Sequence, residues 1–223
     1  MFALSRRRWT GGEQIPQTGG CILVANHATY LDALTFAHFV YDNGRAPRIL
    51  AKASVFKIPL LGTILRSTGM IPVYRNSSEA SKAIDEAVVA IAAGRCVAIF
   101  PEGTLTREPD LWPMAGRTGV ARLALATRAP VVPIAQWGAT SILARYGKLL
   151  KPFPRKTVTV HAGPPVDLSD LYGRPRDTAV LREATERVMA AITALLEEIR
   201  GASAPVERFD MRKSGGSALK GGS

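Results

Sequence analysis

Short apolar runs alternate along the chain with longer segments in which apolar residues recur at helical spacing. The runs lie at residues 21–25, 48–52, 70–74, 96–100, 131–135 and 157–161. Each has the length of a typical strand and is bounded by Gly, Pro or polar residues, so we predict buried β-strands. Pro72 lies inside the third run and favours a strand end or an edge position there, because proline donates no ladder hydrogen bond.

The segments between these runs predict helices. Helical spacing favours helices over residues 29–41, 78–93, 116–127 and 176–200. Pro59 and Gly62 divide residues 54–68 into short helical pieces, and residues 101–114 predict a long loop. Strands that alternate with helices indicate an α/β fold: one layered domain with a largely parallel (mixed) central sheet flanked by helices.

The chain length suits a single domain with a short extension. Of the 223 residues, we expect the domain to occupy residues 1–200 and a polar, disordered tail to occupy residues 201–223. The longest weakly charged stretch, residues 87–101, is broken at Gly94. A membrane span needs roughly 20 apolar residues, so we expect no transmembrane helix. The first residues lack the apolar core of a secretory signal.

The balance of charge points to an anionic partner. The chain has 29 Lys and Arg residues against 18 Asp and Glu, a formal net charge of +11. Such a balance suits nucleic acid, anionic lipid or a phosphorylated substrate. No recognisable nucleic-acid-binding motif is present, so we expect no nucleic-acid partner. Cys21 and Cys96 lie in apolar runs without metal-ligand neighbours, which predicts reduced core residues and no metal site.

A histidine and an aspartate stand five residues apart between two apolar segments. On a regular helix, His27 and Asp32 would lie about 140° apart and could not touch. They can meet if His27 lies on a strand-to-helix turn and Asp32 lies in the first turn of the helix. Thr29 and Asp32 also fit a helix capping box. The residues alone therefore leave two alternatives: a paired imidazole and carboxylate, or a helix cap preceded by a loop histidine.

Further polar residues follow other predicted strands. Lys52 and Arg75 are cations at strand ends, and Glu102, Gly103 and Thr104 follow the run at residues 96–100. In parallel sheets, ligands bind at the carboxyl ends of the strands, so we expect these residues near His27. Gly103 permits a tight turn, Thr104 offers a hydroxyl, and Glu102 can accept a hydrogen bond or hold a basic side chain. The alternative is an ordinary turn and two surface charges.

Four segments, in this order, resemble the motifs of the lysophospholipid (glycerolipid) acyltransferase family. This family includes 1-acyl-sn-glycerol-3-phosphate acyltransferase. The family's Asn-His-x-Ser-x-x-Asp motif matches Asn26, His27 and Asp32, with Thr29 in place of serine. The resemblance covers roughly residues 10 to 165, and four ordered, correctly spaced motifs make it specific.

The other three motifs match with one departure. The family's Gly-x-Ile-Pro-Val-x-Arg motif matches residues 69–75, and its Val-Pro-Ile strand matches residues 132–134. Its Phe-Pro-Glu-Gly-Thr-Arg-Ser motif matches residues 100–104, but Leu105 then replaces arginine and Thr106 replaces serine. Arg107 is the nearest residue that can supply the missing charge.

The resemblance implies an enzyme and a mechanism. His27 would act as general base on a glycerol hydroxyl, Asp32 would orient it, and the hydroxyl oxygen would attack an acyl thioester without a covalent acyl-enzyme. The acceptor implied is 1-acylglycerol-3-phosphate (lysophosphatidate), acylated at the sn-2 hydroxyl to give phosphatidate. Lys52, Arg75 and residues 102–104 would bind the phosphate and polar head. No metal and no bound cofactor are implied, and acyl-CoA or acyl-ACP would be the co-substrate.

Lipid substrates imply a peripheral protein on the cytoplasmic face of a membrane. The expected partners are the lysophospholipid and acyl thioester substrates, an anionic membrane surface and an acyl carrier protein as donor. Residues 1–9 and 142–156 interleave basic and apolar residues, so each is a candidate docking segment. The alternatives are another acceptor (glycerol-3-phosphate, another lysophospholipid or a glycolipid) and, from a different class, a non-catalytic protein that binds anionic lipid.

Overall fold

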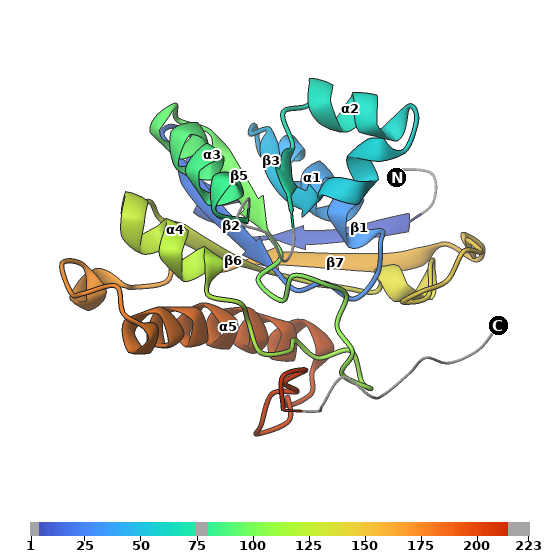
Figure 1. Cartoon of the computed structure of the whole chain (residues 1–223). Coiled ribbons are helices and arrows are strands. Elements are labelled where there is room, and N and C mark those ends of the chain that lie inside the picture. Colours follow the sequence, from blue (N-terminus) through green and yellow to red (C-terminus); the bar gives the residue numbers. More distant parts are fainter. Residues whose placement is uncertain (1–4, 75–79, 214–223) are drawn as a thin grey trace.

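A seven-stranded sheet forms the centre of the protein (Figure 1). The structure, a computed structural model, describes residues 5–74 and 80–213. The strands are β1 (Ser5–Thr10), β2 (Cys21–Ala25), β3 (Pro47–Lys52), β4 (Ile71–Val73), β5 (Cys96–Ile99), β6 (Val131–Trp137) and β7 (Lys156–Ala162). Their order across the sheet is β1-β7-β6-β2-β5-β3-β4.

Five α-helices are described. They are α1 (Asp32–Asp42), α2 (Leu61–Ser67), α3 (Ala80–Ala92), α4 (Gly119–Thr127) and α5 (Thr178–Arg200). A short 3-10 helix, Ala53–Lys57, precedes α2. All neighbouring strands are parallel except β6 and β7, which pair antiparallel. The predicted α/β fold with a largely parallel, mixed sheet is therefore confirmed.

The sheet separates two apolar layers. Along β2, Ile22 and Val24 pack with the layer of α3, α4 and α5, whereas Cys21 and Leu23 pack with the layer of α1. Successive side chains of a strand point to opposite faces, so a strand that is covered on both sides is apolar throughout. All five residues of β2 are buried, which is why the sequence shows an unbroken apolar run there.

The edge strand β1 was not predicted from the sequence. It pairs with β7 over Ser5–Thr10, where the sequence predicts no strand. The membrane-docking role of residues 1–9 stays a prediction. Most of the side chains of β1 are exposed, including Arg6, Arg7 and Arg8, so the strand carries no apolar pattern. Charged, exposed residues are common on edge strands, where they discourage pairing with other chains.

The predicted tail begins directly after α5. Within it, Phe209 O accepts a hydrogen bond from Ala115 N at 2.9 Å, and Ala204 N donates to Glu197 Oε1 at 2.7 Å. Residues 201–213 therefore contact the domain, and residues 214–223 lie outside the described residues. The division at residue 200 stays a prediction.

Candidate functional site

The turn between β2 and α1 is fixed by a pair of amides. Asn26 Oδ1 accepts from Gln136 N at 2.8 Å, and Asn26 Nδ2 donates to Gln136 O at 3.0 Å. Gln136 Nε2 donates in return to Asn26 O at 3.1 Å. Both side chains are buried, at 2% exposure each. Three hydrogen bonds thus join the end of β2 to β6 and fix the position of the backbone directly before His27.

His27 and Asp32 meet at this turn, as the first alternative predicts. His27 Nδ1 lies 3.3 Å from Asp32 Oδ2. The same carboxylate oxygen accepts from the backbone N–H groups of Ala28 at 2.5 Å and Thr29 at 2.7 Å. Asp32 is only 3% exposed, so these donors compensate the burial of its charge. Asp32 can therefore fix the tautomer in which His27 Nδ1 carries the proton.

The predicted capping box forms only in part. Asp32 reaches back to Thr29 N as a capping carboxylate does, but α1 begins at Asp32 itself. The Thr29 hydroxyl donates instead to Leu143 O at 2.8 Å, which ties the turn to the segment after β6. The cap and the imidazole–carboxylate pair are thus one structure, and the two alternatives do not exclude each other.

The imidazole of His27 is held against an aromatic ring. It stacks on Phe100 with centroids 4.0 Å apart and planes at 15°, and Phe36 packs edge-on against Phe100 at 5.6 Å. The His27 side chain is 16% exposed. Within residues 5–74 and 80–213, no hydrogen bond reaches its Nε2 atom. That nitrogen is therefore placed to accept a proton from a bound molecule.

Glu102 lies beneath this turn. It is 1% exposed, and its two oxygens accept from the backbone N–H groups of His27 and Met114, both at 3.0 Å. Burial raises the pKa of Glu102 to about 8, against the opposing effect of those two hydrogen bonds. In this geometry Glu102 braces the backbone of His27. The substrate-binding role expected for Glu102 stays a prediction.

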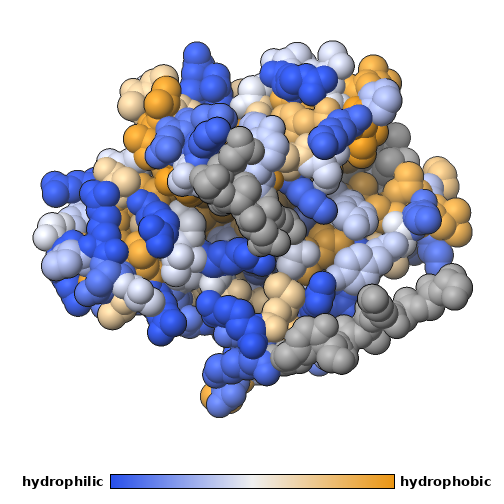
Figure 2. Space-filling view, in the orientation of Figure 1, coloured by the Kyte–Doolittle hydropathy of each residue, from blue (hydrophilic) through white to orange (hydrophobic). Residues whose placement is uncertain are grey.

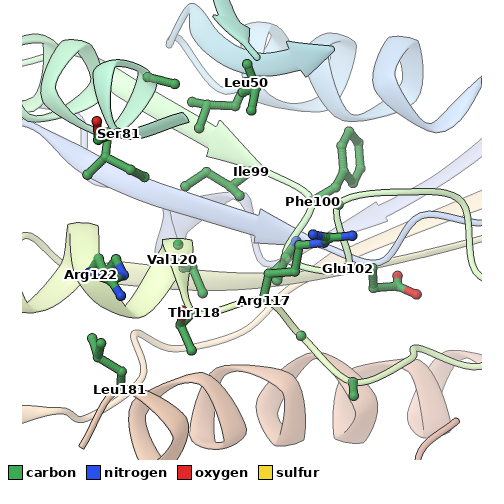
Figure 3. Close-up of a pocket in the computed structure, with 18 of the residues that line it drawn as sticks. Leu50, Ser81, Ile99, Phe100, Glu102, Arg117, Thr118, Val120, Arg122 and Leu181 are labelled. Carbon is green, nitrogen blue, oxygen red and sulfur yellow. The ribbon is translucent and has the colours of Figure 1, made fainter. Parts of the chain in front are cut away.

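A large cavity opens beside the stacked pair. Its volume is about 850 Å³. Apolar residues of β3, β4, β5, α3 and α4 form its walls, namely Leu50, Val73, Ala83, Ile84, Val88, Ile99 and Val120. Phe100 and Glu102 line one end of the cavity (Figure 3), so the ring on which His27 stacks forms part of its wall.

Cations stand at the cavity. Lys52, at the end of β3, is exposed and lines it, as does Arg117 from the loop before α4. Figure 3 shows Arg117 extending toward the Phe100 end, with Arg122 farther along α4. A Cβ on Gly103 would lie 2.8 Å from Arg117 Nε, and Gly103 has φ 71°, so glycine permits this close approach. Thr104 follows, half-buried.

The structure brings some of the predicted site residues together and adds Arg117 to them. His27, Asp32, Glu102 and Gly103 form one cluster, and Lys52 lines the adjoining cavity. Arg75 lies outside the described residues. Leu105 is 3% exposed and brings no charge, and Arg107 is exposed.

Arg117 was missed by the sequence analysis. The available signal was a single arginine among small residues, Gly116-Arg117-Thr118-Gly119, directly before a helix. Such a pattern also occurs in ordinary loops, so only the fold reveals that this arginine lies against Gly103.

The described residues offer neither a candidate membrane-spanning helix nor a candidate metal site. No described helix has the length and apolar character to cross a bilayer. Over residues 5–74 and 80–213, no group of three or more His, Cys, Asp or Glu side chains is arranged to hold a metal ion.

Comparisons with known proteins show which family and fold this chain resembles. The family model described as Acyltransferase matches residues 6–137. A 1-acyl-sn-glycerol-3-phosphate acyltransferase of Borreliella burgdorferi is 28% identical over 189 residues, which cover 82% of this chain and 71% of that protein. An uncharacterized protein of Mycobacterium leprae is 34% identical over 143 residues, 60% of this chain and 36% of that protein.

A solved structure is also similar. The crystal structure of the 1-acyl-sn-glycerophosphate (LPA) acyltransferase PlsC from Thermotoga maritima superposes with a TM-score of 0.67 at 25% identity. The match covers 92% of this chain and 76% of that one. The resemblance that the four sequence motifs predicted is confirmed by these matches.

Proposed function

Because the chain belongs to the acyltransferase family, we propose that it moves a fatty acyl group from an acyl thioester to the sn-2 hydroxyl of lysophosphatidate, giving phosphatidate. As a member of this family it is an enzyme, an O-acyltransferase of the 1-acyl-sn-glycerol-3-phosphate acyltransferase type. The non-catalytic alternative, a protein that only binds anionic lipid, has no support from the family.

The observation that carries the proposal is the geometry of His27. Its Nδ1 atom faces the Asp32 carboxylate at 3.3 Å, and its Nε2 atom has no partner among the described residues. An acceptor hydroxyl within hydrogen-bond reach of Nε2 can give its proton to the ring. The Asp32 carboxylate then stabilises the imidazolium that forms.

The remaining bonds follow from that proton transfer. The hydroxyl oxygen attacks the thioester carbonyl carbon, the carbon–sulfur bond breaks, and the new ester bond remains on the acceptor. The leaving thiolate takes the proton from the His27 imidazolium, which restores the neutral base. A thiol has a pKa near ~8.5, so the thiolate leaves readily. The acyl group passes directly from donor to acceptor, and no covalent acyl-enzyme forms.

Two cations that line the cavity suit the acceptor phosphate. Lys52 and Arg117 are exposed and line the cavity, and neither side chain donates a hydrogen bond to a described residue. An arginine presents a fork of donors that matches a phosphate, and a lysine adds a point charge. We assign the phosphate to these two residues, with Gly103 and Thr104 at the adjoining turn and with Arg75 as predicted from the sequence.

The apolar part of the cavity suits a fatty acyl chain. Its volume of about 850 Å³ lies within the range of roughly 300–1,000 Å³ that is usual for ligand pockets. Leu50, Ile84 and Val120 are among its walls, and burial of each methylene of an acyl chain there is favourable by about 0.8 kcal/mol. The donor is acyl-CoA or an acyl carrier protein, and the proposed steps use no metal and no resident cofactor.

The proposed setting is the cytoplasmic face of a membrane, to which the protein binds peripherally. Residues 142–156 contain no acid, and Tyr146, Leu149 and Phe153 are 56%, 72% and 75% exposed. Basic and apolar side chains together suit an anionic lipid interface. This supports the docking role that we predict for this segment.

One observation favours a second acceptor class. Leu105 occupies the position of the arginine in the family's third motif and is 3% exposed, so it cannot contact a phosphate. An acceptor without a phosphate, such as a glycolipid, would need fewer cations. Glycerol-3-phosphate and other lysophospholipids are the further within-family acceptors.

A thiol-release assay tests the acceptor directly. The enzyme is given palmitoyl-CoA, and in a parallel series a palmitoyl acyl carrier protein, together with one of four acceptors. The acceptors are lysophosphatidate, its unphosphorylated monoacylglycerol counterpart, glycerol-3-phosphate and a glycolipid. We expect the fastest thiol release with lysophosphatidate, accompanied by phosphatidate detected by mass spectrometry. Equal rates with the unphosphorylated acceptor would remove the roles of Lys52 and Arg117, and no release with any acceptor would refute the proposed function.

A further inference from the structure

The segment between β3 and β4 presents a set of apolar side chains to solvent. It projects from the sheet at the upper right of Figure 1. Ile58, Leu60, Leu61 and Ile64 are 49%, 76%, 40% and 48% exposed. Figure 2 shows apolar residues gathered over this part of the surface. Single exposed leucines are ordinary, but four large apolar side chains within seven residues indicate a contact surface.

The backbone holds these side chains outward. Leu60 has φ 61° and ψ −55°, and Leu61 N donates to Pro59 O at 2.7 Å, so residues 59–61 form the strained type of γ-turn. A positive φ at a non-glycine residue is costly, and such strain concentrates at functional segments. Here the strain places the most exposed leucine of the described residues at the tip of the turn.

Hydrogen bonds and a close backbone approach hold the segment together. Gly62 N donates to Ile58 O at 2.8 Å, and a Cβ on Gly62 would lie 2.0 Å from Phe56 O, so the helix α2 rests directly on the preceding 3-10 helix. Arg66 Nη1 donates to the same carbonyl, Phe56 O, at 2.9 Å. The exposed side chains therefore do not collapse onto the domain, and a partner meets them already ordered.

The charge around the segment selects the partner. No Asp or Glu occurs in residues 43–78, whereas Lys52, Lys57 and Arg66 are exposed on or beside the segment. Apolar side chains combined with basic ones, and without any acid, complement a bilayer that contains anionic lipid. The segment follows Lys52, which lines the cavity, so docking here would bring the cavity close to the lipid.

We propose that residues 57–66 are a membrane-docking element that inserts Leu60 and its apolar neighbours into an anionic bilayer beside the cavity. The inference goes beyond the proposed function because it assigns a second contact, separate from residues 142–156. The binding itself does not depend on the reaction, whereas its effect on turnover rests on the proposed function.

The test measures binding of the full chain to vesicles by co-sedimentation. The vesicles contain phosphatidylcholine alone, or phosphatidylcholine and phosphatidylglycerol in equal amounts. Leu60→Ser combined with Ile64→Ser should lower the partition coefficient on the anionic vesicles by about 100-fold, since each buried leucine-sized side chain contributes a factor of roughly ten. The matched control is Val89→Ser on α3, where an equally exposed aliphatic residue (68%) stands beside Asp85 and Glu86.

A second variant separates docking from folding. Leu60→Gly removes the side chain and suits a positive φ, so its melting temperature should equal or exceed that of the wild type while vesicle binding falls. Unchanged binding of both variants would overturn the proposal, and so would equal wild-type binding to both kinds of vesicle. Normal vesicle binding with a loss of turnover only for acyl carrier protein donors would also overturn it and would assign the surface to that protein.

Turnover measurements distinguish a loss of membrane docking from a loss of catalysis. With a short-chain lysophosphatidate kept monomeric in water, the Leu60→Ser, Ile64→Ser variant should release thiol at the wild-type rate. With the acceptor embedded in anionic vesicles, its rate should fall in parallel with binding. A wild-type enzyme without turnover on either substrate would refute the proposed function and leave the vesicle-binding result to stand alone.

Discussion

The two sides of the candidate site are built differently. On the His27 side, a buried amide pair fixes the start of the turn, Asp32 binds two backbone N–H groups, and Glu102 binds the N–H of His27 itself. On the other side, Lys52 and Arg117 are exposed, and their side chains donate to no described residue. One side is held by many hydrogen bonds, and the other leaves its donors unused.

This difference suits the role that we propose for each side. A general base must hold its geometry to within a fraction of an ångström, so its supporting residues are satisfied inside the protein. A cation that meets a phosphate in water gains its hydrogen bonds only when the ligand arrives. Substitutions on the His27 side should therefore change catalysis or folding, and substitutions on the cation side should change affinity.

The largest effect is expected at the base. His27→Ala should lower the rate of thiol release by about 10²–10⁴-fold, because no group remains to take the acceptor proton. Binding of the lysophosphatidate should be retained, measured by equilibrium dialysis. His161→Ala is the matched control, since His161 bonds Thr10 at the far side of the sheet and should leave the rate within about twofold. Wild-type thiol release by His27→Ala would show that the base is another residue.

Asp32→Asn should come next. The amide oxygen can still accept from Ala28 N and Thr29 N, but the charge that stabilises the imidazolium is lost. We expect a fall in kcat of roughly 10²–10⁴-fold with little change in KM. Steady-state thiol release measures both constants. The control is Thr29→Ser, which keeps the hydroxyl that donates to Leu143 O and should retain activity. A large rise in KM without a fall in kcat for Asp32→Asn would contradict the orienting role of Asp32.

The raised pKa of Glu102 should make the stability of the protein depend on pH. Its pKa is raised to about 8 in the folded protein from 4.5, so unfolding releases a proton between these pH values. The free energy of unfolding should therefore fall as the pH rises through this window, by up to about 1.4 kcal/mol per pH unit from this group. Glu102→Gln should remove that contribution, and urea titrations from pH 5 to pH 8 measure it. Equal slopes for both proteins would mean that Glu102 is ionised throughout.

The smallest effect is expected at the cations. Arg117→Gln should raise KM for lysophosphatidate by about 10- to 100-fold and leave KM for the unphosphorylated acceptor unchanged, because a charge-assisted hydrogen bond contributes roughly 1.5–3 kcal/mol. The matched control is Arg122→Gln, which lines the same cavity farther along α4. If both variants behave alike, the effect arises from net charge and not from the position of Arg117.

Local pattern was enough to predict most of the fold. The strands β2 and β5 are buried on both sides, so burial left an unbroken apolar run in each. α3 and α5 each bury one face, so their apolar residues recur at helical spacing. β1 could not be found in this way, because its register depends on β7, about 150 residues later, and its own side chains are largely exposed.

The motifs placed His27 and Asp32 in the site, and the sequence offered two alternatives for them. The tertiary structure showed that the two are compatible, because one carboxylate oxygen serves both the cap and the imidazole. It also gave Glu102 two backbone partners, His27 and Met114, from segments that are distant in sequence. No local pattern carries that information, because both partners are main-chain groups that any residue would supply.

The sequence by itself thus determined most of the elements, the acyltransferase family and the two alternatives for His27 and Asp32, since these depend on residue type and local spacing. Only the tertiary structure placed Arg117 against Gly103, opened the cavity beside Phe100 and turned Leu60 outward. These features arise from how separate elements pack, and packing depends on shape and distance between segments that the order of residues does not express.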